Sequence, residues 1–354
     1  MTSYLKNSWY CAGWGRDLGS KPIGIRICDE PIVLFRTSDD SVAALDGRCP
    51  HRFAPLSIGK VKGDVIECGY HGLQFDRTGA CTLNPHGRGI IPPRAHTRAY
   101  PVAEKHGAIW VWMGDPAAAD PEKILDLFFV DAEGWAGTTG YLKIEANYQL
   151  IIDNLLDLTH GTYLHPDTVG GAPEDTLGDN LHYEFRTEGS TIYSNYTAFN
   201  AAPTPLMGLF YTRSRGDLLA SMRWEPASSL LLDIGIAPIG QPINSGLRVP
   251  SAHLIAPETA NSSHYFFAIS RNWELENLEK TRVMGEIAMK AFAEEDEPVI
   301  ARCFEMMGRR ELFDLAPAIL ETDRAAVQAR RMLTKLIKQE QGHVDAAAGA
   351  EAAE

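Results

Sequence analysis

The sequence predicts an α+β protein of two domains: an all-β domain at the N-terminus, and a C-terminal domain in which helices accompany an antiparallel sheet. Its 354 residues exceed the usual size of a single domain. Short apolar segments separated by Gly, Pro and Asp turns fill residues 1–114 and return over 180–270, a pattern typical of strands. Charged or amphipathic helical patterns dominate 123–170 and 276–340.

The individual strands are predicted where an apolar run is bounded by turn residues. In the first domain these runs are 31–36, 65–70, 73–76 and 108–113. In the second domain they are 182–187, 191–199, 230–238, 251–257 and 263–270. No internal repeat relates the two sets, so we expect two different domains.

A change of composition marks the junction between them. The stretch GDPAAADPE at 114–122 is rich in Pro, Ala and Asp and carries no strand or helix pattern. We therefore expect domains at 1–114 and 123–344, joined by a linker at 115–122. The tail 345–354 has no apolar face, so we expect it to be flexible.

Charge and cysteine content exclude several classes of protein. The 33 basic residues stand against 46 acidic ones, giving a net charge of −13, whereas a nucleic-acid-binding surface needs a basic excess. No segment approaches the ~18 apolar residues of a membrane span, and the first residues do not read as a signal peptide. Six cysteines are too few for a disulfide scaffold. We expect a cytoplasmic protein with neither nucleic acid nor membrane as partner.

Two Cys–His pairs form the first candidate site. Cys49 and His51 are followed, after sixteen intervening residues, by Cys68 and His71. Two thiolates and two imidazoles can hold either a tetrahedral zinc or a two-iron cluster. Common zinc sites take two cysteines from one turn, whereas each turn here offers one Cys and one His. That distribution favours a Rieske-type [2Fe–2S] cluster, in which the thiolates hold one iron and the imidazoles the other. A zinc-stapled binding protein is the alternative.

The remaining cysteines show no paired spacing. Isolated cysteines of this kind usually pack as small apolar side chains, so we expect them to be buried. They are Cys11, Cys28, Cys81 and Cys303.

A polar stripe within an apolar helical pattern forms the second candidate site, at 147–165. Asn154, Asp157 and His160 follow one another at three-residue spacing and so share one face of a helix. Apolar residues on the other sides indicate that the stripe points into the protein. Buried polar groups are costly unless they are hydrogen-bonded or hold a metal.

His160 and His165 can share one metal only under a condition on the backbone. Five residues correspond to about 140° around a regular helix, so the helix must end or bulge between them, which Gly161 and Pro166 would permit. Two histidines and one carboxylate form the facial triad of non-haem Fe(II) oxygenases. A helix end with two hydrogen-bonded histidines is the alternative.

The segments CPHRFAPLS, CGYHGLQFD and DNLLDLTHGTYLH resemble the cluster loops and the iron motif of bacterial Rieske non-haem iron aromatic oxygenases. The resemblance implies a Rieske domain and a catalytic domain of helix-grip type. It also implies that His160 and His165 bind a mononuclear Fe(II). In this family Asp157 would link a ligand histidine to the Rieske histidine of a neighbouring subunit, and Asn154 would contact the iron site.

The third iron ligand is implied by a resemblance far along the chain. FAEEDEPVI (292–300) resembles the late helix that supplies the carboxylate in this family, and Asp296 aligns best. Glu294 and Glu295 are close competitors, and from spacing alone the acidic run could equally be a solvated helix face.

Four further segments resemble aromatic O-demethylases, namely the oxygenase components of the vanillate O-demethylase and dicamba monooxygenase type: NSWYCAGW, NPHG, WVWMGDPAAADP and APET. The implied reaction is a monooxygenation of a methoxy C–H bond on a vanillate-like aromatic, after which the hemiacetal collapses to a phenol and formaldehyde. A Rieske ring or methyl hydroxylase, or an N-demethylase acting on a related aromatic, is the alternative. A Rieske electron carrier without catalysis would leave the long second domain unexplained.

Three residues of the second domain are candidates for contact with the substrate. His253 resembles a substrate-contacting histidine of these demethylases. Leu232 and Asp233 stand on a neighbouring predicted strand where the resemblance leads us to expect a neutral amide. A buried Asp233 would disfavour a carboxylated substrate.

The cofactors and partners follow from what the chain has and lacks. The resemblance implies a [2Fe–2S] cluster, one Fe(II) and O2 as co-substrate. The sequence has no phosphate-binding loop and no complete dinucleotide fingerprint, so electrons from NAD(P)H would arrive through a separate reductase or ferredoxin. An electron path between subunits implies a ring of copies, which we expect to be a homotrimer.

Overall fold

The structure, a computed structural model, describes residues 4–351, with side chains described as far as residue 342. The chain divides into two units: one runs to Ile124 and includes 256–259, and the other comprises Leu125–Ile255 and the chain from Ala260 onward. None of the helices described is both long and apolar enough to cross a membrane.

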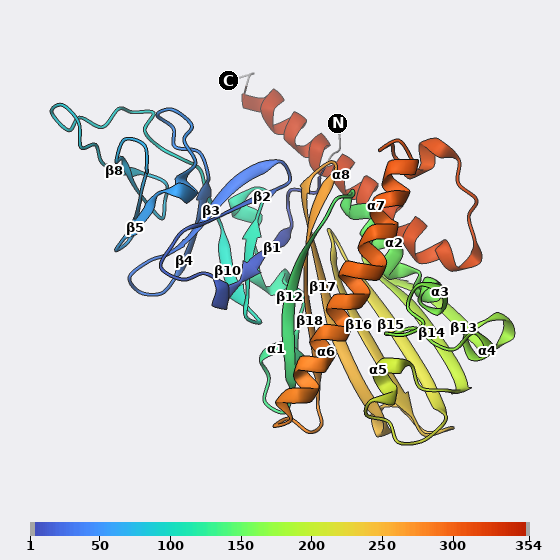
Figure 1. The fold of residues 1–354 in the computed structure, drawn as a ribbon. Coiled ribbons are helices and arrows are strands. Elements are labelled where there is room, and N and C mark those ends of the chain that lie inside the picture. The colour runs from blue at the N-terminus through green and yellow to red at the C-terminus, as the bar shows by residue number, and fades with distance from the viewer. Residues whose placement is uncertain (1–3, 352–354) are drawn as a thin grey trace. The chain divides into compact units, whose positions relative to one another are not determined.

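Within the described residues, the first unit consists of three small antiparallel sheets (Figure 1). The first has the order β1-β11-β10, with bounds Trp9–Trp14, Ala108–Trp112 and Val102–Lys105. The second has the order β2-β3-β4-β9, with bounds Ile23–Ile27, Glu30–Arg36, Val42–Asp46 and Ala99–Tyr100. The third has the order β5-β6-β7-β8, with bounds Lys60–Lys62, Val65–Glu67, Gln74–Asp76 and Cys81–Leu83.

The predicted strands of this unit are present, but some are shorter than the apolar runs. β6 ends at Glu67 instead of residue 70 because the chain turns at Cys68, whose N–H donates to Leu73 O at 2.8 Å. The predicted linker, 115–122, contains two single turns of 3₁₀ helix, Pro116–Ala118 and Pro121–Lys123.

The described part of the second unit is built on a seven-stranded antiparallel sheet in the order β12-β18-β17-β16-β15-β14-β13. The bounds in that order are Ala136–Ile144, Ser262–Arg271, Leu247–Thr259, Ser229–Ala237, Gly216–Glu225, Thr191–Ala201 and Leu181–Glu188. An antiparallel sheet with helices confirms the predicted α+β class.

The prediction that helical patterns dominate 123–170 was wrong for β12. This segment, AGTTGYLKI, pairs along its whole length with β18, from Ala136 opposite Arg271 to Ile144 opposite Ser263. Its glycines and threonines are poor helix formers, and the fully buried strand β18 supplies a partner that local pattern cannot reveal.

The helices of this unit are mostly short before residue 270 and longer after it. They are α1 Phe128–Asp131, α2 Tyr148–Leu156, α3 Gly161–Leu164, α4 Pro173–Thr176, α5 Pro205–Gly208, α6 Leu278–Lys290, α7 Glu297–Met306 and α8 Arg324–Glu351. Figure 1 shows α2 and α6 lying against one face of the sheet. Residues 345–351 of the predicted flexible tail continue α8, and the last three lie outside the described residues.

Candidate metal centres and the adjoining cavity

Two loops of the first unit repeat the same backbone turn around a cysteine. The carbonyl of Cys49 accepts from the N–H of Phe53 at 2.8 Å, and its own N–H donates to Ala54 O at 2.9 Å. The second loop repeats the first bond, from the N–H of Gly72 to Cys68 O at 3.0 Å. Phe53 and Gly72 occupy equivalent places, and both have positive φ, 58° and 73°. The two Cys–His segments are therefore matched turns.

These turns bring the four predicted cluster ligands together in two pairs. The thiols of Cys49 and Cys68 are buried and close enough to hydrogen-bond, and burial raises the pKa of the Cys49 thiol to about 11. The rings of His51 and His71 lie 4.5 Å apart, centroid to centroid. Two buried, neighbouring thiols beside two paired imidazoles fit a cluster with one thiolate-bound and one imidazole-bound iron.

The other cysteines divide between the interior and the surface. The prediction of burial is confirmed for Cys11, Cys28 and Cys81. Desolvation raises the pKa of the Cys11 and Cys28 thiols to about 12. The prediction was wrong for Cys303, which is exposed on α7. An amphipathic helix leaves its outward positions in solvent whatever residue occupies them.

The backbone between α2 and α3 brings two histidines to one point. The helix stops at Asp157, where φ is −116° and ψ is 92°, and a 3₁₀ turn, Leu158–His160, follows. α3 then ends at His165. The prediction of a break between the two histidines was wrong, because the backbone from His160 to Leu164 is helical, with φ and ψ of −56° and −37° at Gly161. The helix is interrupted on either side of this segment, at Asp157 and His165.

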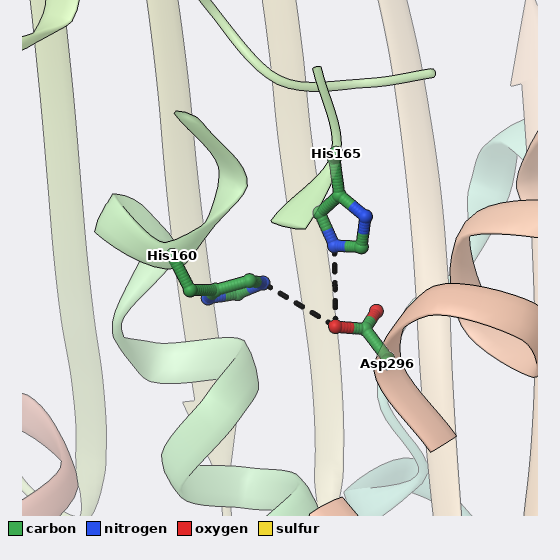
Figure 2. A group of neighbouring side chains, drawn as sticks. All are labelled: His160, His165 and Asp296. Carbon is green, nitrogen blue, oxygen red and sulfur yellow. Dashed lines mark ion pairs between the residues drawn. The ribbon is translucent and has the colours of Figure 1, made fainter. Parts of the chain in front are cut away.

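His160, His165 and Asp296 face one another and form a compact three-residue cluster, as Figure 2 shows. The Oδ1 atom of Asp296 lies 3.1 Å from Nε2 of His165 and 3.5 Å from Nε2 of His160. One ligand atom from each residue lies within 4.8 Å of the other two. Two imidazole nitrogens and one carboxylate oxygen so placed fit a 2-His-1-carboxylate iron site.

Asp296 reaches the histidines from a π-helix, Ala291–Asp296, inserted between α6 and α7. The N–H of Glu297 donates to the carbonyl of Phe292, five residues back. Pro298 has no N–H and crowds the carbonyl four residues before it, which favours the wider turn. Of the acidic run, Asp296 is therefore buried at the cluster while Glu294 is exposed.

The Nδ1 atoms of His160 and His165, which point away from Asp296, each contact an acceptor oxygen. Nδ1 of His160 lies 2.6 Å from the carbonyl oxygen of Asp157, and Nδ1 of His165 lies 2.7 Å from Oε2 of Glu295. Oε2 of Glu295 also accepts from Thr168 Oγ1 at 2.7 Å. Acceptors at Nδ1 leave both Nε2 atoms free for a metal. The sequence had suggested Glu295 only as a competing ligand, and it gave no sign of Thr168.

Burial lowers the pKa of both imidazoles, whereas the neighbouring carboxylates raise it. Desolvation lowers the pKa of His160 despite the nearby charge of Asp296. Desolvation also acts on His165, but its hydrogen bonds to Asp296 and Glu295 outweigh that effect and raise its pKa. A bound cation would compete with the protons of both rings.

Asn154 lies directly against the cluster. Its Nδ2 donates to Oδ1 of Asp296 at 3.1 Å and lies 3.5 Å from Nε2 of His160. The amide therefore sits between two of the proposed ligands, in the position that the resemblance implied. Its place on α2, one turn before Asp157, follows from the predicted polar stripe.

The carboxylate of Asp157 is held by threonines. Its Oδ1 accepts from the N–H and Oγ1 of Thr159 at 3.0 and 2.6 Å, and its Oδ2 accepts from Thr322 Oγ1 at 3.0 Å. Within this chain the main-chain carbonyl of Asp157, and not its carboxylate, contacts His160.

A cavity of about 160 Å³ adjoins the cluster and is lined mainly by apolar side chains of the sheet and of α2, α3 and α6. An engineered protein cavity of roughly 150 Å³ binds benzene, so this space suits a single aromatic ring. His253 and Leu232 line the cavity, and Asp233 does not. Side chains alternate along β16, so Asp233 points to the opposite face, where Arg248 pairs with it.

Comparison with known proteins identifies both halves of the chain. Residues 8–100 match the Rieske [2Fe-2S] domain, and residues 144–339 match the vanillate O-demethylase oxygenase C-terminal domain. The dicamba O-demethylase oxygenase component of Stenotrophomonas maltophilia is 36% identical over 336 residues, covering 94% of this chain and 98% of that protein. The vanillate O-demethylase oxygenase subunit of a Pseudomonas species (strain HR199) is 33% identical over 363 residues, covering 97% and 98%.

Solved structures agree with these sequence matches. The crystal structure of dicamba monooxygenase bound to 3,6-dichlorosalicylic acid superimposes with a TM-score of 0.89 at 35% identity, covering 96% of this chain and 99% of that one. The similarity therefore extends over both units of the chain.

Proposed function

Because this chain belongs to the Rieske non-haem iron oxygenases, as an oxygenase component with a C-terminal domain of the vanillate O-demethylase type, we propose that it removes the methyl group of an aryl methyl ether. Membership of this family confirms the enzyme class and the cofactors predicted from sequence, a [2Fe–2S] cluster and a non-haem iron. The observation that carries the proposal is a ring-sized apolar cavity opening onto the three-residue cluster.

The proposed roles of the residues follow from their geometry. Cys49, His51, Cys68 and His71 would hold the cluster, and His160, His165 and Asp296 would hold the iron. The bound iron supplies activation of O2 with electrons from the cluster. The apolar cavity wall would hold the ring and exclude water, and demethylation requires that the ring be held with its methyl carbon toward the metal.

The reaction balances with two electrons from a separate donor protein. The ether, O2, two electrons and two protons give the hemiacetal and water, and the hemiacetal then breaks its C–O bond to release the phenol and formaldehyde. A reductase or ferredoxin that oxidises NAD(P)H would supply the electrons.

We also propose that the working unit is a homotrimer in which Asp157 links a ligand histidine of the iron site to the Rieske histidine of a neighbouring copy, on the electron path between copies. Its half-buried carboxylate is fixed by threonines, one helical turn from the proposed iron ligand His160. This placement supports a role in holding a ligand histidine of a neighbouring subunit. The variant Asp157→Asn should then keep both metals and lose most turnover, whereas full activity in this variant would remove the inter-subunit route. The six cysteines, all free thiols, support a location in the reducing cytoplasm.

A single-turnover experiment tests the proposed activity. The protein is reduced anaerobically and then mixed with O2 in the presence of a panel of methoxylated aromatics. We expect formaldehyde and the corresponding phenol in equal amounts. A ring-hydroxylated product that keeps its methoxy group would instead establish the alternative, a ring hydroxylase.

A further inference from the structure

The charge of the cavity wall carries an inference about the substrate. Apart from the three proposed iron ligands, the described residues that line the cavity include no lysine, no arginine and no further carboxylate. Two other titratable side chains line it, Tyr196 and His253. The rest of the wall is apolar or carries hydroxyl and amide groups.

Both of these side chains are neutral in the fold. Nδ1 of His253 lies 2.5 Å from the hydroxyl of Tyr265, and its Nε2 lies 3.0 Å from Ser251 Oγ. The imidazole is 1% exposed, and this burial lowers the pKa of His253 to about 4. Burial likewise raises the pKa of Tyr196, whose hydroxyl donates to the carbonyl of Leu156 at 3.3 Å. Neither residue brings a charge to the cavity.

The ion pair between Asp233 and Arg248 faces away from the cavity. Leu232 and Ile234 of β16 line the cavity, and the intervening Asp233 pairs with Arg248 on the opposite face of the sheet. The guanidinium of Arg248 donates to both oxygens of that carboxylate, so it is already engaged.

We infer that the substrate of this site is an uncharged aromatic methyl ether, without an ionised carboxylate or sulfonate group. The inference rests on the proposed function and narrows its substrate class. An anion that leaves water for a wall of neutral groups loses solvation that hydroxyl and amide groups replace only in part, because no opposite charge of the wall faces it. The remaining cation in the cavity would be the iron, and an anion drawn to it would occupy the place that the methyl group must reach. A neutral polar substituent can instead hydrogen-bond with Ser251 or His253.

A matched pair of ligands tests the inference on the unmodified enzyme. 4-Methoxybenzamide and 4-methoxybenzoate have nearly the same shape and differ in charge. Equilibrium dialysis against the iron-loaded, reduced protein under anaerobic conditions gives both dissociation constants. We expect the amide to bind about tenfold or more tightly than the benzoate, because the carboxylate gives up more hydration on entering a wall without an opposite charge. Equal or tighter binding of the benzoate would overturn the inference.

A pair of variants shows whether the cavity wall sets this preference. Leu232→Lys places a cation in the cavity and should raise the affinity for the benzoate relative to the amide. Leu231→Lys makes the same change on the opposite face of the same strand and should leave the ratio unaltered. If Leu232→Lys folds and keeps the wild-type ratio, the inference fails; if it does not fold, the wild-type ratio decides alone.

Admission of O2 to the same samples separates this inference from the proposed function. Preferred binding of the amide without release of formaldehyde would count against demethylation and leave the charge selectivity standing. Preferred binding of the benzoate with release of formaldehyde would support demethylation and overturn the inferred preference for an uncharged substrate.

Discussion

Glu295 determines which nitrogen of His165 is presented to the iron site. Its carboxylate takes the Nδ1 side of the ring at 2.7 Å and is itself fixed by Thr168. With Nδ1 so engaged, Nε2 is the ring nitrogen that faces Asp296. A carboxylate behind a ligand histidine orients the ring and increases its basicity, which strengthens metal binding.

We therefore expect Glu295→Gln to weaken iron binding about tenfold or more, since partners of this kind typically contribute 10- to 100-fold in metal affinity. The measurement is the iron content of the protein after dialysis against graded concentrations of a chelator. Glu294→Gln is the matched control, because Glu294 is the neighbouring, exposed carboxylate. Equal iron retention by both variants would contradict the role of Glu295.

The acidic run also shows where sequence reasoning stops at the residue scale. Glu294, Glu295 and Asp296 are three carboxylates of nearly the same chemistry, and the structure gives them three environments: solvent, the far side of His165, and the cluster. The resemblance selected Asp296 as the ligand, and the geometry supports that choice. The role of Glu295 depends on the pitch of the π-helix, which composition does not reveal.

His253 should make the stability of the second unit sensitive to mild acid. Burial lowers its pKa from the ordinary 6.5 to about 4, so between these values the unfolded chain binds a proton that the native protein does not. Stability must therefore fall as the pH falls through this window, by about 1 kcal/mol between pH 7.5 and roughly pH 5.5.

The comparison that checks this is urea unfolding at both pH values, with metals removed by a chelator. His253→Gln should lose about 1 kcal/mol less than the wild type over this interval. The exposed His182, changed to Gln, should keep the wild-type dependence. An identical pH dependence in all three proteins would show that His253 does not stay neutral.

At the scale of elements, the two histidines belong to one short helical segment that follows the stop of α2 at Asp157 and ends at His165. Their rings lie 5.2 Å apart, centroid to centroid. The five-residue spacing predicted a break between the histidines, whereas the structure interrupts the helix on either side of them. The first interruption was not predicted, because the carboxylate of Asp157 caps the turn by accepting from Thr159. A capping role cannot be told from a polar stripe by spacing alone.

The attachment of α8 to α2 depends on a buried ion pair. Arg330, with a side chain 7% exposed, donates from Nε and Nη2 to the carboxylate of Asp153, at 2.9 and 2.6 Å. Arg330 also reaches Gln149 Oε1 at 3.0 Å. Because Asp153 directly precedes Asn154, this pair fixes the part of α2 that faces the cluster.

Arg330→Met should lower the free energy of unfolding by about 3 kcal/mol, because it leaves the carboxylate of Asp153 buried without its partner. Urea unfolding followed by circular dichroism measures the change. The double variant Asp153→Leu with Arg330→Met should recover most of the loss, since an apolar pair can replace a buried ion pair. Arg302→Met, which breaks the exposed pair with Glu305, should cost less than about 1 kcal/mol. Equal losses for Arg302→Met and Arg330→Met would refute this account.

At the scale of the whole molecule, the two candidate metal sites differ in how far the sequence could predict them. The cluster ligands lie in two adjacent turns whose hydrogen bonds are local, so spacing alone predicted their pairing. The iron site joins α2 and α3 to a helix about 130 residues later, and only the resemblance connected these segments. The cavity required the packed sheet, since the direction in which Leu232 and Asp233 point depends on the pairing of β16.

If electrons pass between copies, two inactive variants should restore activity to one another within a mixed ring. Cys68→Ser removes a cluster ligand and keeps the iron site, whereas His160→Ala does the opposite, so each alone should be inactive. In a ring assembled at random from equal amounts, a subunit with intact iron receives electrons from an intact cluster at roughly one quarter of the interfaces. Isolation through two different affinity tags removes the homotrimers, and each remaining mixed trimer has one productive interface of three, so these assemblies should show roughly a third of wild-type turnover. Assemblies of Cys49→Ser with Cys68→Ser contain no intact cluster and should stay inactive. Mixed rings no more active than either parent would confine the electron path to a single chain.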